Sequence, residues 1–206
     1  MSSYIELSEH YTNKKTLDRI IEIFNGGGLV IYPTDSVYAM GCLSNRIEAI
    51  GKLGLIKNKK IEKADLSFLF SDIKQLTDYI GVISNIQHRA IRRNSPGPIT
   101  FILESKNKLP RPFTKRKTIG ARIPDHPFLL ELIRSLDAPI LTASLHDEDH
   151  IVTYTTDPNE IFQIWDADPR VDLFINGGYG NNIPSTVVDL TKEPFEIIRQ
   201  GLGEFL

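Results

Sequence analysis

Short strand patterns alternate with helix patterns along this chain of 206 residues, but several neighbouring strand patterns have no helix between them. Parallel strands of one sheet need a long crossover, usually a helix, whereas a short turn is enough to join antiparallel strands. A chain that contains both kinds of connection does not build a purely parallel sheet. The pattern therefore predicts an α+β (mixed α/β) fold, in which helices pack on a mixed sheet.

The spacing of apolar residues predicts the individual elements. Helical patterns cover residues 14–25, 47–56, 72–80, 84–93, 126–136 and 157–165. Strand patterns cover residues 29–32, 66–70, 99–103, 118–123, 139–145, 171–175, 185–190 and 195–198. Thr12 or Asn13 can cap the first helix, and the glycines at 26–28 end it. No repeat, low-complexity tract or linker interrupts the series, so we expect one domain over residues 1–206.

The formal net charge of −2 conceals two oppositely charged blocks. Residues 52–122 contain 16 Lys and Arg against 5 Asp and Glu, whereas residues 123–206 contain 4 against 15. A basic block of this kind either serves an anionic partner or forms a solvated face. The charge by itself does not choose between these two interpretations.

Composition excludes several classes of protein. The single cysteine, Cys42, excludes an intrachain disulfide and any multi-cysteine zinc or iron–sulfur site. No apolar run approaches the ~20 residues that cross a membrane. Residues 1–10 lack the basic and apolar regions of a signal peptide. We therefore expect a soluble, cytoplasmic protein with no membrane partner.

Two segments carry polar groups that suit either a ligand or a purely structural role. The loop at 33–38 leaves a buried strand with two hydroxyls, a carboxylate and a phenol, which can bind a ligand or form a turn. Four lysines follow a predicted helix, at Lys57, Lys59, Lys60 and Lys63. They can meet a polyphosphate, or they can end the helix in solvent.

Three further patterns involve later strands. Arg122 alternates with apolar residues, so it needs an anionic partner, which is either a carboxylate ligand or one of the acidic residues after position 123. Thr142 and Ser144 end a buried strand and suit a ligand, but Ser144 lacks the Gly-x-Ser-x-Gly setting of a serine hydrolase. His146 and His150 stand four apart without the glutamate of a zinc-binding helix, so we assign no metal ligands.

Taken together, these segments resemble the YrdC/YciO family of threonylcarbamoyl-AMP synthase-like proteins, in order along nearly the whole chain. The resemblance rests on residues 27–42, 95–103, 115–127, 184–190 and 198–201, including Tyr32-Pro33-Thr34-Asp35-Ser36. The segments Lys115-Arg116-Lys117-Thr118-Ile119-Gly120 and Asn176-Gly177-Gly178-Tyr179 are closer to the YciO branch than to the YrdC branch. The YrdC-like fold is a twisted, open, mixed sheet with flanking helices and a concave basic face.

The resemblance implies the chemistry of an L-threonylcarbamoyladenylate synthase. Threonine and bicarbonate form a carbamate that attacks the α-phosphate of ATP, pyrophosphate leaves, and the product supplies the threonylcarbamoyl group of modified tRNA. ATP is then a substrate that arrives with Mg²⁺, and no permanently bound cofactor is expected. Some members of the family bind double-stranded RNA or tRNA, so these are partners to expect beside threonine, bicarbonate and ATP.

The resemblance also assigns roles by position. The residues expected to bind threonine are Thr34, Ser36, Tyr38, Arg122, Thr142 and Ser185. The residues expected to bind the nucleotide are Lys57, Lys59, Lys63, Thr118, Ser144, His146 and Arg199. Catalysis is assigned to Lys57, Lys59, Arg122 and Ser144. Their task would be to position the reactants and to neutralise charge that develops on the phosphates.

Three departures from the family pattern fall on the nucleotide side. Lys59 replaces an arginine, and an ammonium does not reproduce a bidentate guanidinium. His146 replaces an asparagine, and the acidic residues 147–149 stand where the family has Ser-Pro-Thr. Two hypotheses follow: a synthase with a weakened nucleotide site, or an RNA-binding, translation-associated paralogue without efficient synthase activity. A third, another enzyme that uses the same carboxylate pocket, has no feature that names its substrate.

Overall fold

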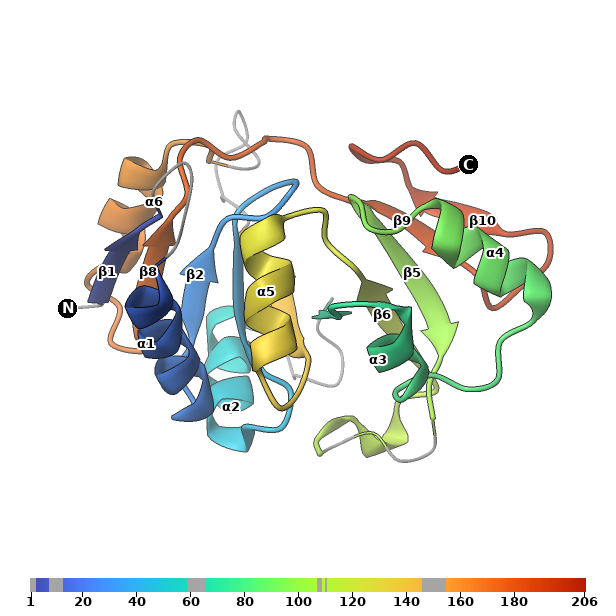
Figure 1. Cartoon of the computed structure of the whole chain (residues 1–206), viewed down its shortest axis with the longest axis horizontal. Coiled ribbons are helices and arrows are strands. Elements are labelled where there is room, and N and C mark those ends of the chain that lie inside the picture. Colours follow the sequence, from blue (N-terminus) through green and yellow to red (C-terminus); the bar gives the residue numbers. More distant parts are fainter. Residues whose placement is uncertain (1–2, 8–12, 59–65, 107–108, 110, 146–154) are drawn as a thin grey trace.

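The computed structural model describes residues 3–7, 13–58, 66–106, 109, 111–145 and 155–206. A ten-stranded sheet forms its centre, in the order β1-β8-β2-β3-β7-β4-β6-β5-β9-β10 (Figure 1). The strands are β1 (Ser3–Glu6), β2 (Val30–Tyr32), β3 (Ala39–Leu43), β4 (Ser67–Leu69), β5 (Ile99–Glu104), β6 (Thr118–Arg122), β7 (Ile140–Ser144), β8 (Leu173–Asn176), β9 (Thr186–Asp189) and β10 (Glu196–Arg199). Parallel pairs such as β4–β6 stand beside antiparallel pairs such as β5–β6, so the sheet is mixed, as predicted.

Helices connect and cover these strands. They are α1 (Lys14–Asn25), α2 (Ile47–Ile56), α3 (Ile73–Thr77), α4 (Asn85–Arg93), α5 (Pro127–Ser135) and α6 (Pro158–Trp165), with a 3₁₀ turn at Phe113–Lys115. Asn13 caps α1, because its side-chain oxygen accepts the backbone N–H of Thr16 at 2.9 Å; the alternative cap, Thr12, lies outside the described residues. Gly27 follows α1 with a φ of +82°, which ends the helix as the sequence predicted.

The predicted ranges of α1 and α2 are confirmed, and the other predicted elements lie within a few residues of the observed ones. Two strands, β1 and β3, were not predicted. The strand β3 reads Ala-Met-Gly-Cys-Leu, and alanine and glycine are both depleted in strands, so local preference gave no signal there. Its position between β2 and β7 buries all five residues, and this tertiary burial decides the structure.

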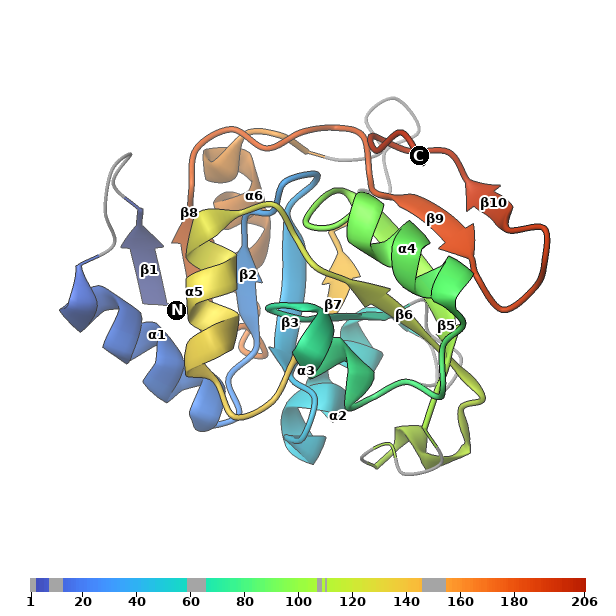
Figure 2. The same ribbon diagram turned by 45° about the vertical axis from the view of Figure 1, so that its right-hand side comes forward.

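The two faces of the sheet pack against different helices, because alternate residues of a strand point to opposite faces. Ile31 and Leu141 lie on the face that packs against α2, α3, α4 and α6. Val30 and Ile140 lie on the other face, which packs against α1 and α5. The helices α1 and α5 contact each other and lie beside the β8–β2–β3–β7 part of the sheet (Figures 1 and 2). Their apolar cluster ends at Leu69 of β4, so it does not extend over β6, β5 and β9.

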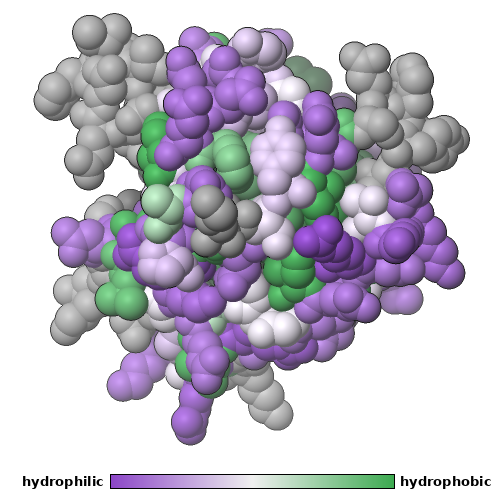
Figure 3. All heavy atoms as spheres, turned by 90° about the vertical axis from the view of Figure 1, so that its left-hand side faces the viewer, coloured by the Kyte–Doolittle hydropathy of each residue, from purple (hydrophilic) through white to green (hydrophobic). Residues whose placement is uncertain are grey.

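The sheet edge at β1 is short and largely polar on its outside. The strand β1 has four residues, of which only Ile5 is buried. Figure 3 shows that this end of the molecule is mostly hydrophilic, with hydrophobic atoms in small separate groups. A short polar edge offers little for another strand to pair with. In the described part of the chain, no helix combines the length and apolar character needed to cross a membrane.

Substitutions at two glycines, Gly41 and Gly51, are expected to change the free energy of unfolding in opposite directions. A Cβ at Gly41 of β3 would lie 2.5 Å from the Tyr32 hydroxyl oxygen, whereas a Cβ at Gly51 of α2 would have no neighbour within 4 Å. We expect Gly41→Ala to lower the free energy of unfolding by about 1–3 kcal/mol. We expect Gly51→Ala to raise it by about 0.5–1 kcal/mol, because alanine favours a helix interior. Urea unfolding measures both, and equal effects of the two substitutions would contradict this account.

Candidate functional site

A cavity of about 520 Å³ lies on the part of the sheet beyond the α1 and α5 cluster. Its floor is made of residues of β7, β4, β6, β5 and β9, which alternate along β4, β6 and β5, and the loop after β2 and the strand β10 form its rim. Among the described residues of the lining, none belongs to α1–α6. The same alternation that puts apolar residues under α1 and α5 puts polar residues on this floor, such as Ser67, Thr100 and Thr142. The fold therefore leaves a hollow lined by strand side chains.

The loop between β2 and β3 is folded by its own hydroxyl group. Thr34 Oγ1 donates to the Val37 carbonyl at 2.7 Å and accepts the backbone N–H of Ser36 at 3.0 Å. This is the hydroxyl-stabilised turn that these residue types favour. The turn buries Ser36, which is 2% exposed and lines the cavity. The turn interpretation and the ligand interpretation of this loop are therefore compatible, because the turn is what places Ser36 in the cavity.

Arg122, at the end of β6, is held by the same loop. Its Nη2 donates to Asp35 Oδ1 at 2.6 Å, its Nη1 to Ser36 Oγ at 3.0 Å and its Nε to the Gly97 carbonyl at 3.3 Å. Asp35 Oδ2 also accepts the backbone N–H of Asp125 at 3.0 Å, where the chain turns toward α5. Guanidinium has five N–H donors. Among the described residues, the hydrogen bonds of Arg122 use three of them, which leaves two for a ligand.

The protein partner of Arg122 differs from the one that the sequence suggested. The expected protein partner was an acidic residue after position 123, but the carboxylate is that of Asp35, 87 residues earlier. Both side chains are buried, with exposures of 8% for Arg122 and 9% for Asp35. Burial lowers the pKa of Arg122, and the neighbouring Asp35 carboxylate opposes this shift. The guanidinium stays charged, because its pKa starts far above neutrality.

Three arginines and no acidic residue line the cavity in the described part of the chain. These are Arg116, Arg122 and Arg199. Arg122 and Arg199 both line this one cavity, so their positive charges act on the same space. The Nη2 of Arg199 donates to the Ser185 carbonyl at 2.8 Å, and Ser185 Oγ lies 3.0 Å from Thr100 Oγ1. A wall of this kind fits an anionic ligand that also has hydrogen-bonding groups.

The structure brings eight of the predicted site residues together in the lining. They are Thr34, Ser36, Thr118, Arg122, Thr142, Ser144, Ser185 and Arg199. Lys57 follows α2 beside the cavity, where its Nζ donates to the Ser144 carbonyl at 2.6 Å. Lys59, Lys63 and His146 lie outside the described residues.

Tyr38 is not brought into the cavity. Its side chain is 1% exposed, and its hydroxyl donates to the Gly178 carbonyl at 2.7 Å and accepts the backbone N–H of Gly177 at 3.1 Å. The backbone N–H of Asn181 reaches the Ser36 carbonyl at 3.0 Å from the same segment. Tyr38 therefore joins the glycine-rich segment after β8 to the loop that carries Ser36.

Sequence reasoning missed several side chains of the cavity, including Ser67, Thr100 and Arg116. A signal for Thr100 was present, because it is a polar residue that alternates with the apolar Phe101 in a predicted strand. Arg116 stands in a run of three basic residues at 115–117, and nothing local shows which one faces inward. In the structure, its guanidinium carbon lies 5.3 Å from the centre of the Phe113 ring, and this contact orients it.

A metal site was not expected, and it remains untested at His146 and His150, which lie outside the described residues. Within the part of the chain that the structure describes, no group of three or more His, Cys, Asp or Glu could hold an ion. Cys42 is buried, and burial raises the pKa of its thiol to about 12. It is therefore an inert core residue at physiological pH.

The sheet and the arginine-lined cavity define an α/β protein with a cavity whose charge suits a small anionic ligand. The chain belongs to the Sua5/YciO/YrdC family, whose model, described as "Telomere recombination", matches residues 22–201. The crystal structure of Escherichia coli YciO is 33% identical, with a TM-score of 0.89 and full coverage of both chains. This match confirms the family, the fold and the likeness to YciO.

Two more distant relatives carry functional names. A threonylcarbamoyl-AMP synthase of Buchnera aphidicola is 30% identical over 166 residues, which are 79% of this chain and 91% of that protein. The crystal structure of P. abyssi Sua5 complexed with L-threonine is 23% identical, with a TM-score of 0.81, and the match covers 98% of this chain and 57% of that one. At this identity, the Sua5 likeness shows the fold alone.

The buried pair of Asp35 and Arg122 gives a first test of the site. In Asp35→Asn, an amide replaces the carboxylate and leaves a buried cation without a counter-charge, so we expect the free energy of unfolding to fall by about 3 kcal/mol. Asp168→Asn is the matched control, because it removes the carboxylate that pairs with Arg170, which is 40% exposed. That change is expected to cost about 0–1 kcal/mol. Guanidinium unfolding measures both, and a similar cost for the two variants would contradict the assignment.

Proposed function

We propose that this protein binds threonine in the cavity and activates it as a threonylcarbamoyl adenylate, with a nucleotide site weaker than that of its synthase relatives. The observation that carries this proposal is the buried Arg122, which lines the cavity and keeps two N–H donors after its bonds to the described residues. The planar fork of a guanidinium matches a carboxylate. Support also comes from the threonine in the Sua5 structure and from the synthase name of the Buchnera relative.

The threonine would lie between the loop after β2 and the strands β7 and β9. Arg122 would bind its carboxylate, because its guanidinium lines the cavity and keeps N–H donors, and Ser36 lines the cavity beside it and holds Arg122 Nη1 as an acceptor. Thr142 and Ser185 provide hydroxyl groups on the same lining. In this arrangement the amine of threonine stays free to react with bicarbonate, which is the condition for forming the carbamate.

The remaining cations suit the phosphates of ATP. A carbamate oxygen would attack the α-phosphorus, the bond to the bridging oxygen would break, and pyrophosphate would leave with the bonding electrons. Arg116 and Arg199 line the cavity and would neutralise the charge on these phosphates. No carboxylate belongs to the described lining, so no described residue is assigned to the Mg²⁺ that would arrive with ATP.

Two features support a weak nucleotide site. The Nζ of Lys57 donates to a backbone carbonyl, that of Ser144, at 2.6 Å, so a phosphate would have to compete for this ammonium. The sequence has Lys59 and His146 where the family has arginine and asparagine. A guanidinium makes two parallel hydrogen bonds to a phosphate, and a lysine at the same position makes weaker, less directed contacts.

Pyrophosphate release from ATP tests this proposal. We expect release that requires both L-threonine and bicarbonate and that is slow in the natural chain. The variant with Lys59→Arg and His146→Asn restores the family residues and should release pyrophosphate about tenfold faster or more. Arg122→Lys should weaken threonine binding about tenfold or more, because an ammonium cannot form the fork.

The control for Arg122→Lys is Arg170→Lys, which changes an arginine that does not line the cavity. It should bind threonine like the natural chain. Folded protein that releases no pyrophosphate in the presence of all three substrates, and binds no threonine in calorimetry, would refute the proposal. Release that is independent of threonine would refute it as well.

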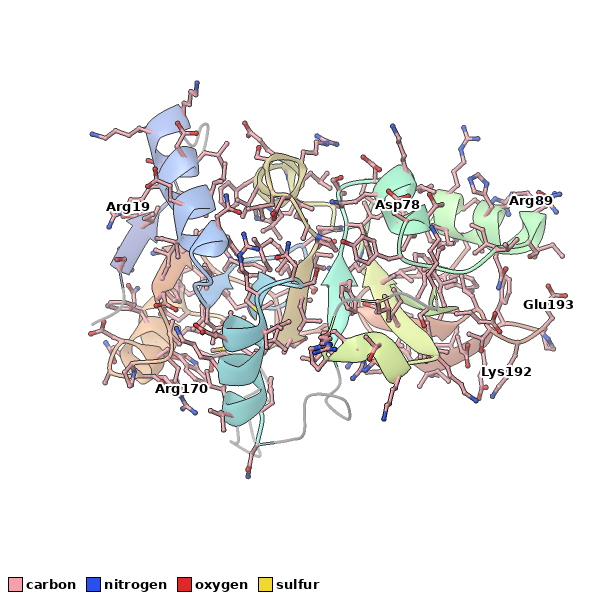
Figure 4. All side chains as sticks on the ribbon, turned by 90° about the horizontal axis from the view of Figure 1, so that it is seen from below. Arg19, Asp78, Arg89, Arg170, Lys192 and Glu193 are labelled. Atoms are coloured by element: carbon pink, nitrogen blue, oxygen red, sulfur yellow. The ribbon has the colours of Figure 1, made fainter. Side chains whose placement is uncertain are left out.

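A second candidate function, the binding of double-stranded RNA or tRNA, is favoured by a surface that the cavity does not explain. Arg89, Arg92 and Arg93 are exposed on α4, at spacings that place them on one side of the helix. Within the described part of the chain, none of the three forms an ion pair. Arg89 projects from the end of the molecule opposite Arg19 (Figure 4). A row of exposed arginines suits a phosphate backbone.

Salt dependence tests the RNA function separately from the synthase function. Replacing Arg89, Arg92 and Arg93 by glutamine should reduce the slope of log affinity against log salt by about 3, one for each phosphate that the variant no longer neutralises. Threonine binding should not change. Replacing Lys14, Lys15 and Arg19 on α1 by glutamine removes the same charge at the opposite end and is the control. Equal effects of the two triple variants, or an affinity that salt does not change, would argue against this surface.

A further inference from the structure

Tyr32 has a buried hydroxyl that forms a hydrogen bond with Thr142, a residue of the cavity wall. The side chain is fully buried on β2, where it packs near Phe24 of α1, with ring centres 6.4 Å apart. Its hydroxyl oxygen lies 2.8 Å from Thr142 Oγ1. Thr142 lines the cavity, but Tyr32 does not. The tyrosine can therefore act on a ligand only through Thr142.

The contact between Tyr32 and Thr142 depends on a glycine. The strand β3 lies between β2 and β7, and Gly41 of β3 is paired with Thr142 in the sheet. A Cβ at Gly41 would lie 2.5 Å from the Tyr32 hydroxyl oxygen, so any side chain there would displace the phenol. The missing side chain lets Tyr32 extend across β3 to the next strand. The contact is thus a built feature of three adjacent strands.

The hydrogen bonds of Thr142 show what this contact does to its hydroxyl. A hydroxyl has one proton to donate and two lone pairs to accept with. Tyr32 donates its proton to Thr142 Oγ1 at 2.8 Å, and the Met40 carbonyl lies 3.4 Å from the same oxygen, which is longer than an ordinary O–H···O bond. Burial raises the pKa of Tyr32 far above its usual value, so it remains a neutral donor. Tyr32 thus takes one lone pair of Thr142 Oγ1, and the second lone pair can accept a hydrogen bond from a ligand in the cavity.

The arginines of the cavity wall provide hydrogen-bond donors and positive charge, whereas Thr142 provides an acceptor. Arg122 offers two N–H donors, and Arg199 and Arg116 add further positive charge. A carboxylate has no donor, so it fits Arg122 and not Thr142. The amine must react with bicarbonate in the proposed function. Besides its amine, which must stay accessible to bicarbonate, threonine has one further donor, its side-chain hydroxyl, and Thr142 is an acceptor fixed on the same lining.

We propose that Tyr32 is a positioning residue that holds Thr142 as a fixed hydrogen-bond acceptor and thereby makes the cavity select amino acids with a side-chain hydroxyl. The inference rests on the proposed function, in which threonine occupies the cavity. A site that is built to bond a hydroxyl rejects the analogue that lacks it, because the buried polar group then has no partner. Selectivity is thus the property that Tyr32 controls, and general ligand affinity is not.

Calorimetry with two ligands tests the proposal. L-2-Aminobutyrate is threonine without its hydroxyl, so the ratio of the two Kd values measures recognition of that group. The natural chain should prefer threonine by about 3- to 10-fold or more, the effect of one neutral hydrogen bond. Tyr32→Phe should weaken threonine binding by about 3- to 10-fold and leave 2-aminobutyrate within about twofold. A merely structural defect would weaken both ligands together.

Two further variants complete the test. Thr142→Val removes the acceptor and should abolish the preference for threonine, and adding Tyr32→Phe to it should cause no further loss, because both changes remove one interaction. Tyr79→Phe is the matched control, since Tyr79 is half-buried against Phe70 on the other side of the sheet, with ring centres 5.4 Å apart. It should leave both Kd values unchanged.

The outcomes separate this inference from the proposed function. A natural chain that binds neither amino acid overturns the proposed function and this inference with it. A natural chain that prefers threonine, together with a Tyr32→Phe variant that keeps the preference, overturns the inference alone. Equal losses for both ligands in Tyr32→Phe also overturn it. If circular dichroism shows that Tyr32→Phe does not fold, the ratio of Kd values in Thr142→Val decides, and an unchanged ratio overturns the inference.

Discussion

The buried ion pair between Asp35 and Arg122 organises the functional half of the molecule. It joins the loop after β2 to the end of β6, and Asp35 also holds the turn into α5 through Asp125. A buried charge without its partner is costly, so the loop and the strand end must keep their relative positions. The same pair orients a guanidinium that still has donors for a ligand. One interaction thus fixes both the rim of the cavity and the guanidinium that we propose binds the ligand.

The cavity exists because one face of a continuous sheet is covered unequally. The helices α1 and α5 bury apolar residues from β8 to β4. The same face continues over β6, β5 and β9, where polar residues such as Thr118 and Thr100 lie beside apolar ones such as Val187. The opposite face is packed along both halves by α2, α3, α4 and α6. This second layer stabilises the floor of the cavity from behind. The protein therefore has an open polar face on a rigid, well-packed support.

The polar groups of the cavity are arranged by chemical type. Arginines supply donors and positive charge, while Thr142 is set as an acceptor by the buried Tyr32. An amino acid has an acceptor-only carboxylate and can carry a donor on its side chain. A cavity that has the donors of Arg122 on one wall and the acceptor Thr142 on another can therefore orient it. The exposed arginines of α4 belong to a separate surface, and they explain a part of the basic block that a small ligand does not use.

The sequence by itself determined the mixed sheet, the ranges of α1 and α2 and many of the polar residues that line the cavity, because periodicity and ordered motifs are local properties. It did not determine β3, whose small residues become a strand only between two neighbours. It also left open the partner of Arg122 and gave no sign that Tyr38 bonds to the segment after β8, since both contacts depend on segments distant in the chain. Only the tertiary structure brings Asp35 to Arg122 and Tyr32 to Thr142, because burial forces each polar group to find a partner wherever the fold provides one.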